Sequence, residues 1–164
     1  MAKTNYLIEG LSGSGKSSVY DELVGRGYDA ITTDRTWGYH ADAITGLSGG
    51  PIHHDNFMWD KQKATESLES NEPDILFVCG SSRNRDDFLH HFTMIFNLEI
   101  DDKTMRRRLL ERTNNDFGKK PEEIQLMLEL NRKGDKPAGA IDINANQELN
   151  QVVDEILGYC GLDK

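Results

Sequence analysis

The stretch Gly10-Leu11-Ser12-Gly13-Ser14-Gly15-Lys16-Ser17 decides how this chain folds. Its pattern is G-x-x-x-x-G-K-[S/T], in which the glycines let backbone N–H groups come close to phosphate oxygens. The lysine of such a pattern places a positive charge near the β- and γ-phosphates of a nucleotide, and the hydroxyl that follows can bind Mg²⁺. The stretch therefore predicts a phosphate-binding loop, or P-loop.

The sequence on either side predicts a strand before this loop and a helix after it. Tyr6-Leu7-Ile8 is a short apolar run that suits a buried parallel strand. After the loop, apolar residues recur at helical spacing as far as Gly25, a suitable helix end. Such a helix points its N–H groups and the positive end of its dipole at the phosphates. The residues expected to bind the nucleotide here are Gly10, Leu11, Ser12, Gly13, Ser14, Gly15, Lys16, Ser17 and Ser18.

Length and composition predict one compact cytoplasmic domain over residues 1–164. The net charge is −9, which argues against a nucleic acid polymer as the partner, because a phosphate backbone needs a basic surface. No apolar run approaches the ~18 residues of a membrane span. Two cysteines, Cys79 and Cys160, are too few for a disulfide framework. We expect a monomer or a homodimer without membrane attachment.

Apolar runs alternate with amphipathic stretches along the chain, and this alternation predicts an α/β fold with a five-stranded parallel sheet and helices on both faces. The expected strands are residues 5–10, 29–33, 75–79, 94–100 and 140–143. The expected helices are residues 15–25, 60–70, a short one near 88–92, one capped by Asp102 or Thr104 that runs to 112, one from Pro121, and 147–158. Ligands of such a sheet gather beyond the carboxyl ends of its strands.

Asp34 follows the second expected strand and should lie at this edge. Its carboxylate could hold a water bound to Mg²⁺, accept a proton from a substrate hydroxyl, or orient that substrate. The alternative is a turn residue that caps its own backbone. Arg35 beside it could pair with an anionic substrate or remain a solvated surface residue.

The third expected strand ends in a loop that contains Gly80, Arg83 and Arg85. Two arginines among small residues form a local positive site suited to a phosphate or carboxylate. The alternative is pairing with Asp86 or Asp87. We expect Cys79 to be a buried apolar residue, since no neighbour in the sequence would activate its thiol.

A third basic cluster precedes the turn-rich residues 113–121, which we interpret as a small lid loop. Arg108 and Arg112 are four residues apart and so share one helix face. Arginines at the base of a lid could neutralise charge that develops during phosphoryl transfer. A solvated basic helix face is the alternative.

Residues 35–60 form the expected acceptor-binding segment, which is rich in aromatic and histidine residues. Trp37 could stack on a planar acceptor or belong to a small hydrophobic core. A zinc site at His53-His54-Asp55 is disfavoured because further ligands at suitable spacing are missing.

With these motifs the chain resembles the P-loop small-molecule kinases, which include nucleoside monophosphate, shikimate and gluconate kinases, and most of all small bacterial proteins described as AAA-family ATPases or nucleoside kinase-like. The resemblance implies that Arg108, Arg112 and, farther along, Arg132 stabilise the transferring phosphate. It also implies that the adenine of ATP lies near Asn144 and the residues after it. Two departures matter: Cys79 stands where nucleoside monophosphate kinases carry Asp, and Thr32-Thr33-Asp34 keeps one of the two aspartates of shikimate kinases.

These observations predict an ATP- and Mg²⁺-dependent phosphotransferase acting on a small molecule, with a nucleoside or nucleotide as the leading acceptor. Lys16, Asp34 and the three arginines are the expected catalytic residues. Ser17 is expected to bind Mg²⁺ directly, and Asp34 through water. The expected substrate contacts are Asp34, Arg35, Trp37, Gly80, Arg83 and Arg85. The alternatives are a kinase of a sugar acid, a shikimate-like compound or an antibiotic, and a regulatory nucleotide-binding protein or slow ATPase without an acceptor.

Overall fold

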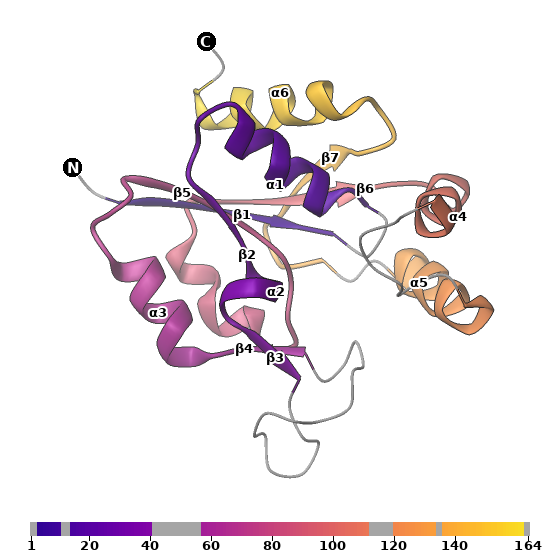
Figure 1. The fold of residues 1–164 in the computed structure, drawn as a ribbon, viewed down its shortest axis with the longest axis horizontal. Helices are drawn as coiled ribbons and strands as arrows, with labels where there is room; N and C mark the ends of the chain where they lie inside the picture. Colours follow the sequence, from indigo (N-terminus) through magenta and orange to yellow (C-terminus); the bar gives the residue numbers. More distant parts are fainter. Residues whose placement is uncertain (1–2, 11–13, 41–56, 112–119, 134–135, 163–164) are drawn as a thin grey trace.

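A five-stranded parallel sheet forms the centre of the molecule and carries helices on both faces (Figure 1). The structure is a computed structural model, and it describes residues 3–10, 14–40, 57–111, 120–133 and 136–162. The fold class predicted from the sequence is confirmed. The middle of the expected acceptor segment and residues 113–119 of the expected lid loop lie outside the described residues.

The strands of the sheet follow the order β2-β5-β1-β6-β7, and every neighbouring pair is parallel. Their bounds are β1 Thr4–Glu9, β2 Ala30–Thr32, β5 Ile75–Cys79, β6 Met94–Glu99 and β7 Ile141–Asn144. The bounds of β5 are those predicted, because it is a continuous apolar run buried at the centre of the sheet. The other strands differ from prediction by one residue, at one end in β6 and at both ends in β1, β2 and β7.

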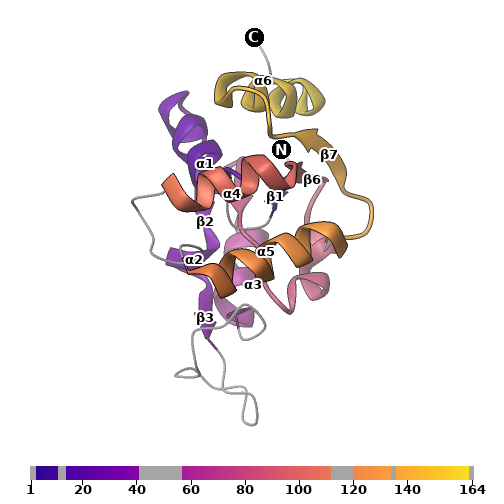
Figure 2. The same cartoon turned by 90° about the vertical axis from the view of Figure 1, so that its right-hand side faces the viewer.

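The helices divide between the two faces of the sheet and its carboxyl edge. In Figure 1, α1 (Lys16–Gly25) and α6 (Leu149–Cys160) lie above the sheet, and α3 (Lys61–Glu69) lies below it. The 3₁₀ helix η2 (Arg85–His91) packs with α3 on the lower face. Figure 2 shows α4 (Asp102–Glu111) and α5 (Pro121–Lys133) side by side beyond the carboxyl ends of the strands.

Two apolar cores lie on the two faces because successive strand residues point to opposite sides. In β1, Tyr6 and Ile8 face α1 and α6, whereas Leu7 faces α3 and η2. Glu9 has the same parity as Leu7 and belongs to the α3 side. The carboxylate of Glu9 thus lies on the face of the sheet away from α1, the helix that follows the phosphate loop.

One small sheet was not predicted. The four-residue helix α2 (Thr33–Thr36) leads into β3 (Gly38–His40), which pairs antiparallel with β4 (Phe57–Trp59). We call these two strands the acceptor hairpin, because they bound the expected acceptor segment. Each strand has three residues, too few for an alternating pattern to be recognised in the sequence.

The cap of α4 also differs from prediction. The expected cap was Asp102 or Thr104, but the side chain of Asp101 accepts a hydrogen bond from the Thr104 N–H at 2.7 Å. This bond, with smaller contributions from the positive charges of Lys103 and Arg107, holds the pKa of Asp101 below its ordinary value.

No helix in the described residues is long and apolar enough to cross a membrane.

Candidate functional site

The described part of the phosphate loop has the backbone geometry that its glycines predict. Gly15 has a φ of +102° and directly precedes α1, whose first hydrogen bond runs from the Val19 N–H to the Gly15 carbonyl. Gly10 has a φ of +157°, and a side chain there would collide with the Ser14 hydroxyl. That hydroxyl is buried and has no hydrogen-bond partner among the described residues. These features fit a loop built to face a phosphate group.

The first turn of α1 presents the polar residues of the motif at the carboxyl edge. Lys16 is half-buried, and Ser17 and Ser18 are exposed. Their backbone N–H groups are those that a helix leaves without partners in its first turn. Leu11, Ser12 and Gly13 lie outside the described residues.

Arg108 links the phosphate loop to the loop that follows β7. Its guanidinium donates to the Ser14 carbonyl at 3.2 Å and to the Ala145 carbonyl at 2.6 Å. Burial, with a smaller contribution from Arg107, lowers the pKa of Arg108. The structure therefore places this arginine between the two loops that the resemblance assigns to ATP, while the assignment itself stays a prediction.

Asn144 shapes the second of these loops. Its side-chain oxygen accepts hydrogen bonds from the backbone and side-chain N–H groups of Asn146, at 3.0 and 3.1 Å. The side chain of Asn146 in turn accepts from the Asp101 N–H at 3.1 Å. The contact expected between Asn144 and adenine stays a prediction.

A buried ion pair that was not predicted from the sequence lies directly before the phosphate loop. Glu9 is 1% exposed, and both its carboxylate oxygens accept from the Arg85 guanidinium at 3.2 Å. Arg85 is also buried and donates to the Ser81 hydroxyl at 3.1 Å. Because a buried ion pair costs desolvation and adds little stability over apolar residues, its place at the phosphate loop points to a functional role.

This pair changes the interpretation of the loop after β5. Arg85 was expected to bind an anionic substrate, but its guanidinium is directed to Glu9 inside the protein. Of the two aspartates considered as alternative partners, Asp86 lies 3.5 Å from Arg85 Nε. Arg83 is exposed and remains a candidate for an anionic group.

Two further expected substrate contacts have packing roles in the structure. Trp37 is 2% exposed, lies 5.4 Å from Trp59 in a T-shaped contact and donates from Nε1 to the Ser67 hydroxyl. Of the two roles considered for Trp37, this packing matches membership of a small hydrophobic core. Gly80 is buried, and a side chain there would collide with the Thr33 hydroxyl, so this glycine permits close packing of α2 on β5.

Asp34 and Arg35 are exposed on α2, at the carboxyl edge next to β2. Their contacts with substrate and metal stay predictions. Arg112 and the side chain of Arg132 lie outside the described residues.

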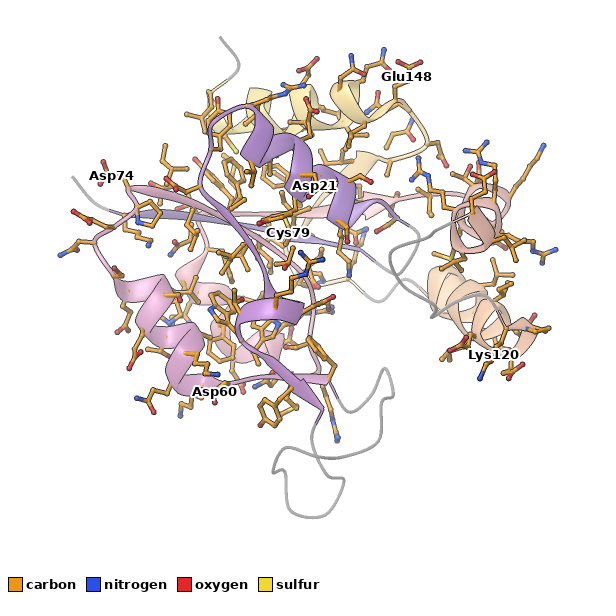
Figure 3. The ribbon with its side chains drawn as sticks, viewed as in Figure 1. Asp21, Asp60, Asp74, Cys79, Lys120 and Glu148 are labelled. Atoms are coloured by element: carbon orange, nitrogen blue, oxygen red, sulfur yellow. The ribbon has the colours of Figure 1, made fainter. Side chains whose placement is uncertain are left out.

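Cys79 confirms the expectation of a buried apolar residue. It is 2% exposed and lies in the core beneath α1 (Figure 3). Burial raises the pKa of its thiol to about 12, although Lys16 opposes the shift. Among the described residues, no group of three His, Cys, Asp or Glu side chains could hold a metal.

Glu9 could have been found in the sequence. A carboxylate that directly follows an apolar strand and directly precedes a phosphate loop has to lie at the carboxyl edge. Its partner could not have been found in this way, because Arg85 lies far along the chain, at the start of a short 3₁₀ helix.

Comparisons with known proteins bear on the fold. No known family profile and no curated protein matches the sequence. Among solved structures, a gluconokinase from Sinorhizobium meliloti 1021 is 23% identical with a TM-score of 0.60, over 94% of this chain and 90% of that one. A sugar kinase from Janibacter sp. HTCC2649 is 14% identical with a TM-score of 0.58, over 98% and 95%. A deoxyadenosine kinase from M. mycoides with bound dATP is 11% identical with a TM-score of 0.57, over 96% and 99%. The chain thus has the fold of the P-loop small-molecule kinases.

Proposed function

We propose that the protein is an ATP- and Mg²⁺-dependent kinase that transfers the γ-phosphate to a hydroxyl group of a small molecule. The observation that carries this proposal is the buried pair of Glu9 and Arg85 directly before the phosphate loop. The pair lies on the face of the sheet that also carries the acceptor hairpin, opposite α1. A carboxylate in this position lies between the phosphate loop, on the donor side, and the acceptor hairpin, on the acceptor side.

On the donor side, the N–H groups of the loop and Lys16 would hold the β- and γ-phosphates. Ser17 would bind Mg²⁺, which neutralises phosphate charge when bound. Arg108, Arg112 and Arg132 would counter the charge that develops during transfer. The deoxyadenosine kinase with bound dATP supports a nucleotide as a ligand of this fold, since it shares the fold along nearly the whole chain.

On the acceptor side, a carboxylate suits a hydroxyl nucleophile better than a phosphate. The second pKa of a phosphate group is about 6, so its attacking oxygen is already ionised near neutral pH and a nearby carboxylate repels it. A hydroxyl has to lose its proton as its oxygen bonds to the γ-phosphorus and the bond to the β–γ bridging oxygen breaks. Glu9 would take that proton and later release it to water. Arg85 would hold the carboxylate in position.

The acceptor class that follows contains nucleosides first and sugars or sugar acids second. The similar solved structures include both kinds of kinase: a gluconokinase, a sugar kinase and a deoxyadenosine kinase. Arg85 is neutralised by Glu9, which weakens the case for an acceptor that carries a phosphate. Asp34 would orient the acceptor or hold a water bound to Mg²⁺, and the exposed Arg35 and Arg83 could contact it.

The test is a transfer assay with γ-labelled ATP, Mg²⁺ and four separate pools: nucleosides, nucleoside monophosphates, neutral sugars and sugar acids. We expect label in a new compound from the nucleoside pool or a sugar pool. Lys16→Ala should transfer label at only roughly 10⁻²–10⁻³ of the rate of the unmodified protein. Label only in the monophosphate pool would contradict the hydroxyl acceptor. Label only as free phosphate, at equal rates with every pool, would favour the slow ATPase or regulatory alternative.

A further inference from the structure

The loop between β5 and η2 is attached to the acceptor hairpin by three hydrogen bonds. The Arg83 N–H donates to the Phe57 carbonyl at 2.9 Å. The side chain of Asn84 accepts from the Trp59 N–H at 2.9 Å and donates to the Trp59 carbonyl at 3.0 Å. Asn84 therefore pairs with both backbone groups of Trp59, as a residue of a third strand would.

The orientation of the Asn84 side chain is fixed from a third direction. The Ser82 hydroxyl donates to the same side-chain oxygen at 2.8 Å, which leaves the amide NH₂ to face the Trp59 carbonyl. These bonds are partly buried, so water competes with them less than at an exposed site.

The residue after Asn84 is the partner of Glu9. Asn84, which is attached to the hairpin, and Arg85, whose guanidinium binds the Glu9 carboxylate, are thus adjacent in the chain. On its other side, the hairpin is attached to α3, because Trp37 packs on Trp59 and donates to Ser67. A continuous series of contacts therefore runs from the phosphate loop to the hairpin.

We propose that Asn84 is a positioning residue that couples the acceptor hairpin to the Glu9–Arg85 pair. When a nucleotide fills the phosphate loop, the ion pair next to Gly10 adjusts, and Asn84 transmits this adjustment to Trp59. The same link aligns Glu9 when an acceptor engages the hairpin. This role rests on the proposed function in that it assumes a nucleotide at the phosphate loop. It is argued from the hydrogen bonds that Arg85 makes to Glu9 and that its chain neighbour Asn84 makes to Trp59.

The chain contains its own reporter for this coupling. Its two tryptophans are Trp37 and Trp59, and both lie in the core under the hairpin. This core is on the face of the sheet opposite α1, so a nucleotide at the phosphate loop would not touch either ring. A change in tryptophan emission on nucleotide binding must then be transmitted through the protein.

The experiment titrates Mg²⁺-ATPγS into the full chain, with its dissociation constant measured by calorimetry and tryptophan emission recorded in parallel. We expect the emission of the unmodified protein to change with the same midpoint as the heat. Asn84→Ala should bind the nucleotide with an unchanged dissociation constant and lose the emission change. Asn84→Asp, which keeps the oxygen that accepts from Trp59 but loses the donor, should show a reduced change.

A matched control variant is Asn5→Ala. Asn5 also donates two hydrogen bonds to backbone carbonyls, those of Leu68 and His91, and also joins two segments, but at the amino end of the sheet. It should lose stability and keep the emission change. If Asn84→Ala fails to fold, Asn84→Asp against Asn5→Ala carries the same comparison.

Three results would overturn the proposal. They are nucleotide binding without any emission change in the unmodified protein, an emission change that Asn84→Ala retains in full, and an equal loss in Asn5→Ala. Absence of nucleotide binding would overturn both the coupling and the proposed function. Because binding and emission are measured separately, failure of the coupling alone is distinguished from failure of the proposed function.

Discussion

In the proposed function, Glu9 is the residue at which the phosphate loop and the acceptor side meet. It ends β1, precedes Gly10, and is held inside the protein by Arg85. The glycine beside it is equally constrained, because its positive φ and the nearness of Ser14 exclude a side chain. Two adjacent residues thus serve two needs, a placed carboxylate and a backbone that can approach phosphate.

Gly10→Ala tests the second of these needs. The added methyl group meets Ser14 and also requires an unfavourable φ, so we expect the free energy of unfolding to fall by about 1–3 kcal/mol and nucleotide affinity to fall with it. Gly25→Ala is the control, since a side chain there meets nothing within 4 Å. It should be neutral or stabilise α1 by up to about 1 kcal/mol. Urea unfolding and calorimetric titration measure both effects. Unchanged stability and affinity in Gly10→Ala would show that the loop has a different geometry.

Cys79 predicts a loss of stability in alkali. Burial raises its thiol pKa from 9.0 to about 12, so above pH 9 the unfolded chain releases a proton that the folded protein retains. The stabilisation is complete below pH 9 and is lost as the pH rises toward 12. Cys79→Val removes this thiol while keeping an apolar side chain. We expect the variant to lose less stability than the unmodified protein between neutral and alkaline pH, measured by urea unfolding at each pH. Parallel pH profiles for the two proteins would refute this prediction.

At the scale of elements, the sequence predicted what depends on local pattern. The continuous apolar run Ile75–Cys79 gave the bounds of β5, and the apolar stripe of the last helix gave α6 within two residues at each end. The two strands of the acceptor hairpin were missed, because each has only three residues and their pairing is not a local pattern. The partner of Glu9 and the bonds of Asn84 were missed for the same reason, since tertiary contacts and not local pattern create them.

The start of α3 offers a test of an element that local chemistry fixes. Asp60 caps this helix by accepting from the Lys63 N–H at 2.9 Å, and it stands at the beginning of α3 in Figure 3. Asp60→Ala should reduce the free energy of unfolding by about 1 kcal/mol, because one N–H of the first turn loses its partner. Lys61→Ala, at an exposed position one residue on, should change it by less than about 0.5 kcal/mol. Equal effects of the two substitutions would mean that the cap adds nothing.

In the molecule as a whole, the two faces of the sheet carry different elements of the candidate site. One face carries α1, which begins at the phosphate loop, and the other carries the acceptor hairpin on α3 and η2. Beyond the carboxyl edge lies α4 (Figure 2). It contributes Arg108, whose guanidinium joins the phosphate loop to the loop after β7. In the proposed reaction, Glu9 is the carboxylate that reaches from the phosphate loop to the acceptor face.

The most direct measurement compares Glu9→Gln with Asp34→Asn, using the acceptor that the labelled pools identify and saturating Mg²⁺-ATP. Glutamine can still accept a hydrogen bond from Arg85 but is not a base, so kcat should fall roughly 10²–10⁴-fold while the dissociation constant of ATP stays unchanged. Asp34→Asn should affect chiefly KM for the acceptor, because Asp34 is exposed on α2. Transfer by Glu9→Gln at the rate of the unmodified protein, together with a large fall in kcat for Asp34→Asn, would contradict the role of Glu9 and transfer it to Asp34.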